Sequence, residues 1–109
     1  MIDIDDIDRA VEFLRDSSEK AAKARAERLH MEDFTKSLRA KLMCEHTNKP
    51  LGAQEREALA DQRYISHLEV LKQCIHDDEK FRFLREAAQA KIEVWRSQLS
   101  WAKTQESIR

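Results

Sequence analysis

The chain contains one glycine and one proline among its 109 residues, and both stand in the four-residue window Lys49-Pro50-Leu51-Gly52. Glycine and proline interrupt helices most strongly, so the sequence on either side of this window carries no strong helix breaker. We therefore predict an all-α protein built as one long antiparallel helical hairpin. The expected elements are a helix over about residues 5–47, a turn over 48–52 and a helix over about 53–107, all in a single domain covering residues 1–109.

The second predicted helix has one weak point, the acidic cluster His76-Asp77-Asp78-Glu79. Asp78 is the only polar interruption of the apolar stripe predicted for this helix, and acidic residues are frequent helix caps. A kink or break near Asp77, within residues 76–79, is therefore the alternative to one continuous helix. Such a break would let the chain fold back as a compact monomer, whereas unbroken helices favour a dimer.

Apolar and small residues recur along both predicted helices at intervals of three, four and seven residues, which is the spacing of one helix face. Two long helices bury only a narrow seam between them, and further apolar residues lie beside it. We therefore expect two chains to form a homodimer that closes into a four-helix bundle. The predicted core or dimer stripe comprises Leu14, Ala21, Ala24, Phe34, Leu38, Tyr64, Leu68, Leu71, Phe81, Leu84, Ile92, Trp95 and Leu99.

Charged residues make up 38% of the chain, with 20 basic and 21 acidic residues and a net charge of −1. A balanced charge gives no overall attraction to nucleic acid or to an anionic membrane. No apolar run is long enough to span a bilayer, and the acidic N-terminal sequence lacks the basic and apolar parts of a signal peptide. We expect a protein of the bacterial host cytoplasm, with no membrane partner and with its two cysteines reduced.

The candidate metal and catalytic motifs are weak. Residues 44–46 and 74–76 both read Cys-x-His, but residues two apart on a helix point about 200° away from each other and cannot chelate zinc from one turn. Glu27 and His30 match one half of a di-iron motif, and the second predicted helix offers no other half. The chain also lacks a glycine-rich phosphate loop and a nucleophile in a recognisable turn. We predict no enzyme, no catalytic residue, no metal and no cofactor.

The segment 20–41 is the better candidate for binding, because it holds seven basic residues against three acidic ones. Four of the basic residues can fall on or near one helix face and contact phosphates. Near the C-terminus, an arginine beside Trp95 can add stacking on unpaired bases. The competing interpretation is a solvated surface paired within the chain, as in Glu32 with Lys36 at i, i+4 spacing. The candidate nucleic-acid or partner-binding residues are Lys20, Lys23, Arg28, Lys36 and Arg96.

Several short segments occur in a characteristic order: Glu19-Lys20-Ala21-Ala22-Lys23-Ala24, Glu27-Arg28, Glu32-Asp33-Phe34-x-Lys36-Ser37, Gln54-Glu55-Arg56-Glu57-Ala58-x-Ala60, Tyr64 and Lys91-Ile92-Glu93-Val94-Trp95-Arg96-Ser97-Gln98. Together these segments resemble a family of small helical phage and prophage proteins. The resemblance spans roughly residues 18–100, and its most distinctive part is residues 91–98. Proteins of that family are mostly uncharacterised and are encoded in early regions, beside single-strand annealing proteins, exonucleases and single-strand binding proteins.

This resemblance implies a non-enzymatic phage accessory protein of DNA recombination or replication. Such a protein would act through contacts with a recombination or single-strand binding protein, with DNA contact as an option. The alternative is an inhibitor of a host defence system, of the anti-CRISPR type, whose partner would be a host defence complex. A third interpretation is a purely structural coiled-coil assembly protein whose only partner is itself.

Overall fold

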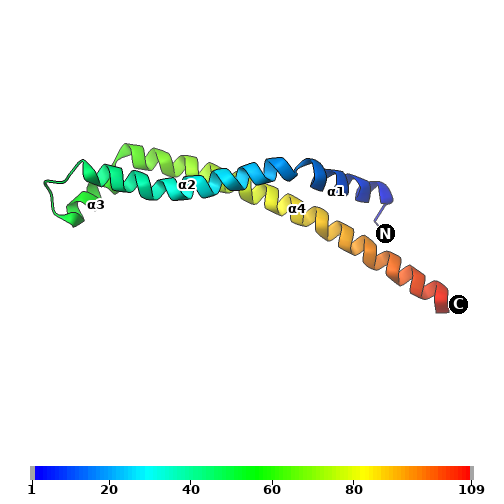
Figure 1. Cartoon of the computed structure of the whole chain (residues 1–109). Helices are drawn as coiled ribbons and strands as arrows, with labels where there is room; N and C mark the ends of the chain where they lie inside the picture. Colours follow the sequence, from blue (N-terminus) through cyan, green and yellow to red (C-terminus); the bar gives the residue numbers. More distant parts are fainter. Residues whose placement is uncertain (1, 109) are drawn as a thin grey trace. The chain divides into compact units, whose positions relative to one another are not determined.

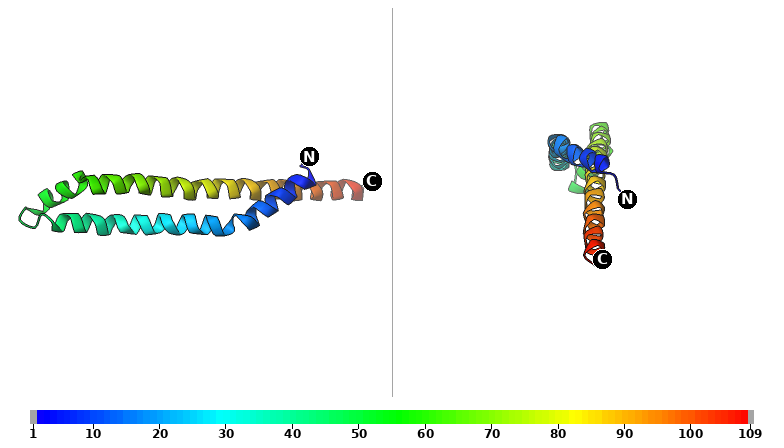
Figure 2. Two further views of the ribbon diagram at one scale, coloured as in Figure 1. Left: turned by 90° about the horizontal axis from the view of Figure 1, so that it is seen from above. Right: turned by 90° about the vertical axis from the view of Figure 1, so that its right-hand side faces the viewer.

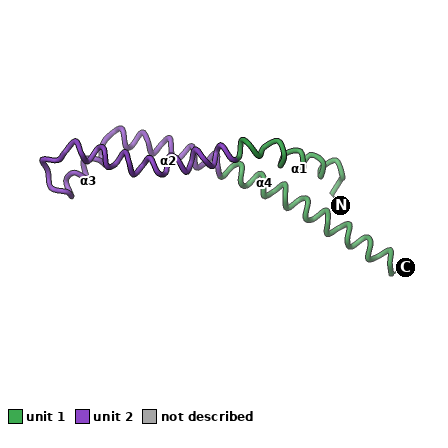
Figure 3. Tube along the Cα trace, viewed as in Figure 1, with its two compact units in different colours: residues 1–21, 79–109 green, residues 22–78 purple. Residues whose placement is uncertain are grey.

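A computed structural model describes residues 2–108 and contains four helices (Figure 1). Helix α1 covers Ile4–Asp16, α2 covers Ser18–Cys44, α3 covers Leu51–Ala60 and α4 covers Gln62–Ile108. No strand occurs among the described residues, so the predicted all-α class is confirmed. The chain divides into two compact units, one formed by residues 1–21 and 79–109 and the other by residues 22–78 (Figure 3).

In the first unit, which we call unit 1, α1 packs antiparallel to the C-terminal half of α4. Near the start of α1, the Ile2 backbone N–H donates to Gln98 Oε1 at 3.1 Å. Near its end, Arg85 Nη1 donates to the Leu14 carbonyl at 2.7 Å. Residue numbers therefore rise along α1 as they fall along α4. Figure 2 shows that α4 continues past the N-terminal end of α1.

In unit 2, residues 22–44 of α2 pack antiparallel to the first half of α4, and α3 closes the turn end. Thr35 Oγ1 lies 2.7 Å from His67 Nε2, and Arg39 Nη2 donates to Glu55 Oε1 at 2.7 Å. The most buried apolar residues here are Leu42, 2% exposed, and Ala58, 0% exposed. Both lie at the turn end, where three helical segments meet and a side chain can be covered from more than one side.

The helix predicted over residues 5–47 is interrupted at Ser17, and that prediction of one continuous element is wrong. The Leu14 carbonyl accepts a hydrogen bond from Ser18 Oγ at 2.6 Å and a second one from Arg85 Nη1 at 2.7 Å. Side chains that bond to a carbonyl of the preceding turn compete with the backbone ladder and bend or interrupt helices. The helical segment also ends at Cys44, earlier than expected.

The helix predicted over residues 53–107 begins at Leu51, directly after Pro50, and is divided at Asp61 into α3 and α4. Asp61 adopts an extended backbone conformation with φ −67° and ψ 135°, which ends α3. Its carboxylate then accepts the Arg63 backbone N–H at 2.8 Å. Satisfying a free N–H of the first turn is the role of an N-cap, so Asp61 starts α4 as well as ending α3.

The break considered near Asp77 does not occur, because α4 runs without interruption through residues 76–79. The acidic side chains there have partners that are compatible with a continuous helix. Asp77 Oδ1 accepts from Gln73 Nε2 at 2.9 Å, one turn earlier on the same helix. Asp78 Oδ2 accepts from Arg28 Nη1 on α2 at 3.2 Å, so this carboxylate faces a neighbouring helix and caps nothing.

The Asp61 cap predicts a pH dependence at the junction between α3 and α4. The guanidinium and backbone N–H of Arg63 donate to the Asp61 carboxylate and lower its pKa from 3.8 to about 2. A depressed pKa means that this group stabilises the fold fully above about pH 4 and that the contribution is lost as pH falls through about 2. A carbon NMR titration should show Asp61 ionising near pH 2, with faster amide exchange at residues 62–65 below that point.

The matched control for this titration is Asp61→Asn, because an asparagine keeps a capping oxygen but does not titrate. In that variant, amide exchange at residues 62–65 should lose its dependence on pH between 4 and 2. An Asp61 carboxyl that titrates at its ordinary value of 3.8 would show that the cap and its Arg63 contacts are not present in solution.

Candidate functional site

The seam, meaning the line along which the antiparallel helices touch within each unit, contains polar residues that the predicted stripe left out. Ten of the thirteen predicted stripe residues are half-buried. The other three are Phe34, Leu68 and Leu84, which are 38%, 41% and 44% exposed. Each of them stands beside a polar residue that occupies the seam in its place, namely Thr35, His67 and Arg85.

Thr35 and His67 form a polar layer across the seam of unit 2. Thr35 Oγ1 donates its one proton to the Met31 carbonyl at 2.8 Å. The 2.7 Å contact with His67 must therefore be a hydrogen bond donated by His67 Nε2. His67 is 7% exposed, and the Phe34 ring meets its imidazole edge-on with the ring centroids 5.2 Å apart. A polar pair at a seam position favours one register, since sliding the helices would leave both groups unpaired.

Arg85 forms the corresponding polar layer in unit 1. Its Nη1 donates to Ser17 Oγ at 2.8 Å as well as to the Leu14 carbonyl at 2.7 Å. Leu14 lies in the last turn of α1, where the carbonyl groups give the helix a partial negative charge. The positive charge of the Arg85 guanidinium is therefore favourable at this helix end. Its hydrogen bond to Ser17 Oγ also explains why the residue that ends α1 is a buried serine. The sequence does indicate that both residues belong to the seam, because seam positions recur at intervals of three and four residues and this spacing includes Ser17 and Arg85.

Arg28 was predicted as a phosphate- or partner-binding residue, and its position in the structure argues against that role. Arg28 Nε donates to Glu32 Oε1 at 3.0 Å, and its Nη1 donates to Asp78 Oδ2 at 3.2 Å. The Arg28 and Asp78 side chains are only 27% and 17% exposed. This ion pair explains why an acidic residue, Asp78, interrupts the apolar stripe of α4. Arg28 therefore supports the packing of α2 on α4 in unit 2.

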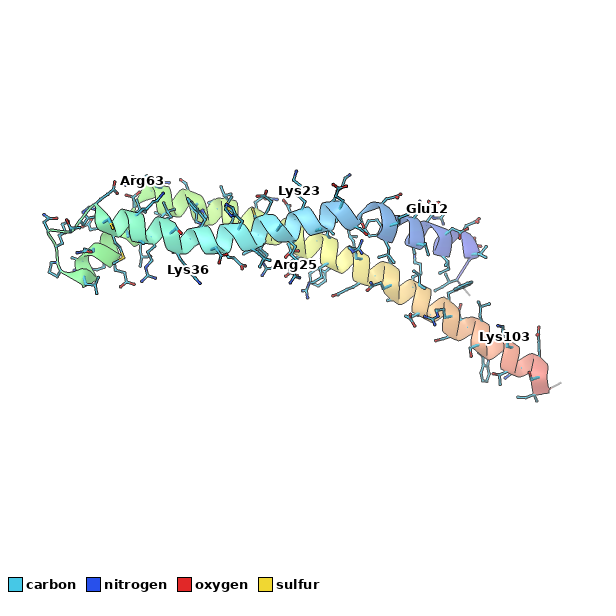
Figure 4. The ribbon with its side chains drawn as sticks, viewed as in Figure 1. Glu12, Lys23, Arg25, Lys36, Arg63 and Lys103 are labelled. Atoms are coloured by element: carbon cyan, nitrogen blue, oxygen red, sulfur yellow. The ribbon has the colours of Figure 1, made fainter. Side chains whose placement is uncertain are left out.

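The remaining predicted binding residues are exposed but do not form one surface. Lys23 and Lys36 extend to opposite sides of α2 (Figure 4), as expected for residues thirteen apart on a helix. Lys20 belongs to unit 1. Arg96, on α4, donates to Glu93 Oε1 at 3.1 Å. Lys20, Lys23, Arg28 and Lys36 therefore do not share one exposed face, contrary to the expectation from the sequence.

A mixed basic and apolar surface does exist on the outer side of α2 in unit 2. Arg25 and Lys36 extend to the same side in Figure 4. Leu29, four residues after Arg25 and seven before Lys36, falls on the same helix face by its spacing. Leu29 is 48% exposed, and no ion pair among residues 2–108 involves either cation. Glu32, the expected partner of Lys36, binds Arg28 instead. We call this surface the α2 outer face and define it as Ala22, Arg25, Leu29, Lys36 and Ala40, with Asp33 as the one acid beside them.

The two cysteines are free and lie in different settings. Cys44 is exposed at the C-terminal end of α2, and Cys74 is half-buried in α4. Within the described part of the chain, no group of three or more His, Cys, Asp or Glu side chains is arranged to hold a metal ion. Over the same residues, no helix is both long and apolar enough to cross a membrane.

Comparisons with known proteins found no similar protein. No protein family, no curated protein and no solved structure matches the chain.

Proposed function

We propose that this chain is a non-enzymatic accessory protein of phage DNA recombination or replication, and that it acts by docking on another protein. The observation that supports docking is the α2 outer face, where the exposed Leu29 shares a helix face with Arg25 and Lys36, two cations that form no ion pair within residues 2–108. An apolar side chain ringed by charges can contribute burial energy and orientation to a protein contact. The recombination context comes from the resemblance to early-region phage proteins.

The chemistry of this face favours a partner segment that is acidic and carries an apolar side chain. Arg25 and Lys36 would each meet a carboxylate, and Leu29 would meet the apolar side chain between them. The arrangement suits DNA less well. Duplex binding uses several cations along one surface, and Lys23 and Lys36 extend to opposite sides of α2. We therefore propose protein contact as the primary activity, with the annealing protein or the single-strand binding protein as the partner.

Reversing the two cations of the α2 outer face should weaken partner binding. For Arg25→Glu/Lys36→Glu we expect the Kd for the phage annealing or single-strand binding protein to rise at least about tenfold, because attraction becomes repulsion at two contacts. Isothermal titration calorimetry with the purified proteins measures this change. Circular dichroism should show unchanged helix content, since neither cation forms an ion pair with any residue of the described part of the chain.

A matched control is Lys23→Glu/Lys41→Glu, which changes the net charge by the same amount on the same helix. Lys23 and Lys41 are eighteen residues apart, so they lie on one line along α2. Lys23 extends to the side opposite Lys36 in Figure 4. This control should bind the partner as the wild type does. Equal loss of affinity in both variants would mean that net charge, and not the α2 outer face, governs binding.

A further inference from the structure

Helix α4 carries a second stripe in unit 1 that no part of the described chain covers. Eight positions spaced alternately by four and three residues contain no charged residue, in a chain of which 38% is charged. Its four large members, Phe83, Val94, Trp101 and Ile108, are 58%, 48%, 65% and 74% exposed. We call these positions the second stripe: Phe83, Ala87, Ala90, Val94, Ser97, Trp101, Thr104 and Ile108.

The large members of the second stripe lie on the side of α4 that faces away from α1. The seam side of this helix contains Arg85, Ala88 and Ile92, and the stripe positions fall roughly half a turn away from them. Val94, Ser97 and Trp101 line a depression in the surface of α4. Only the small Ala87 borders a depression that α1 also lines, so α1 leaves the large stripe residues exposed. An uncharged stripe of about seven turns of exposed helix is the sequence pattern of a helix–helix interface.

We propose that a second copy of this chain packs on the second stripe, so that the two α4 helices lie antiparallel across a two-fold axis. The intervals between stripe positions are the same in both chain directions. Each stripe residue of one copy therefore lies opposite a stripe residue of an antiparallel copy. The layers then place a larger side chain against a smaller one at the centre. The pairs are Ala90 with Trp101, Val94 with Ser97, Ala87 with Thr104 and Phe83 with Ile108.

The antiparallel arrangement fits better than a parallel one because of side-chain size. In a parallel pair Trp101 would face Trp101, while Ala87 and Ala90 would face themselves, so one helix separation could not suit all layers. A parallel pair would gain contacts between Glu86 and Lys91, but exposed ion pairs contribute little. The antiparallel register brings no like charges together at its edges, since Lys91 lies beside Gln98 and Glu93 beside Ser100.

The dimer places the two α4 helices in the middle and one α1 on each outer side. Unit 1 of each chain thus contributes two helices, which specifies how the predicted four-helix assembly would be built. The interface is separate from the α2 outer face, which lies in unit 2. A result that contradicts the dimer therefore leaves the proposed partner docking unaffected, and the reverse also holds.

Sedimentation equilibrium of the full chain tests the proposal. We expect the wild type to sediment at twice its chain mass of 12.8 kDa and Val94→Glu/Trp101→Glu to sediment at 12.8 kDa. Two charges buried in an apolar interface oppose its formation. The control Gln89→Glu/Lys103→Gln makes the same change in net charge outside the stripe and should remain dimeric. A monomeric wild type, or a stripe variant that stays dimeric, would overturn the proposal.

Disulfide trapping tests the orientation. In a chain with Cys44→Ser and Cys74→Ser, Ala87→Cys in one copy should cross-link to Thr104→Cys in another copy, as identified by the mass of the mixed product. Two Ala87→Cys chains should not cross-link with each other, because the antiparallel register separates these positions by about 25 Å along the axis. Efficient cross-linking of Ala87→Cys with itself would contradict the antiparallel arrangement.

Discussion

We expect Leu42→Ala to lower the free energy of unfolding by about 2–5 kcal/mol, which is the range for removing a buried leucine side chain. Leu42 is 2% exposed and is the most buried of the large apolar residues in the described chain. Apart from Ile7 in unit 1, the other buried residues are small or polar, so few contacts in unit 2 are available to compensate for the loss. Urea unfolding followed by circular dichroism gives the free energy and, through its slope, tests whether the transition remains cooperative.

The matched comparison is Leu29→Ala, the same substitution on the same helix at a residue that is 48% exposed. Its effect should stay within about 0.5 kcal/mol, as for other surface positions. If the two variants unfolded at the same urea concentration, the C-terminal end of α2 would not pack at the turn end of unit 2 as the structure shows.

The second large effect should come from the polar layer of Thr35 and His67. Thr35→Val removes the hydroxyl that accepts from His67 Nε2 and leaves a polar atom unpaired in a residue only 7% exposed. We expect a loss of about 1–3 kcal/mol, which is the cost of leaving such a group unsatisfied. Thr35→Val/His67→Leu should recover most of this loss, because replacing both partners by apolar groups removes the unpaired atom.

A double-mutant cycle of Thr35→Val, His67→Leu and the combined variant isolates the interaction between these two side chains. Thr35→Ser serves as the conservative control, since it keeps the hydroxyl and should retain most of the stability. Additive effects in the cycle would mean that the two residues do not meet across the seam, and the register of unit 2 would then have to be different.

The sequence was sufficient to predict helices throughout and to locate most of the seam. It misled where an apolar residue stood beside a polar one, because hydrophobicity alone selected Phe34 over Thr35 and Leu68 over His67. The strict spacing from Met31 to Leu38 and from Tyr64 to Leu71 passes through the polar residue in each case. Spacing was the better guide because a polar side chain is tolerated in the seam when the opposing helix supplies its partner.

The two helix breaks were harder to foresee because each depends on a contact or a local conformation that composition does not show. Ser17 ends α1 where Arg85, distant in sequence, bonds to the Leu14 carbonyl. Asp61 is a recognisable capping residue, but nothing around it in the sequence resembles a turn. Near Asp77 the alternative of a break, suggested by the acidic cluster, is not realised, because Arg28 on the neighbouring helix binds the Asp78 carboxylate.

The prediction of a basic face failed for a related reason. Counting cations in residues 20–41 takes no account of the side of the helix on which each one lies, and Arg28 is turned into the seam. Arg25 and Leu29 were missed because neither residue stands out by type. Only the assignment of inward and outward positions along α2 shows that Arg25 and Lys36 share a side and that the spacing of Leu29 places it on the same face.

The measurement that tests the proposed function most directly is capture of partners by the tagged full chain from phage-infected cells, with the extract divided into nuclease-treated and untreated halves. We predict that mass spectrometry identifies the phage annealing, exonuclease or single-strand binding protein in both halves, and that Arg25→Glu/Lys36→Glu loses it while Lys23→Glu/Lys41→Glu retains it. Recovery of a CRISPR or other defence complex instead, or loss of the partner after nuclease treatment, would contradict docking on a recombination protein by direct protein contact.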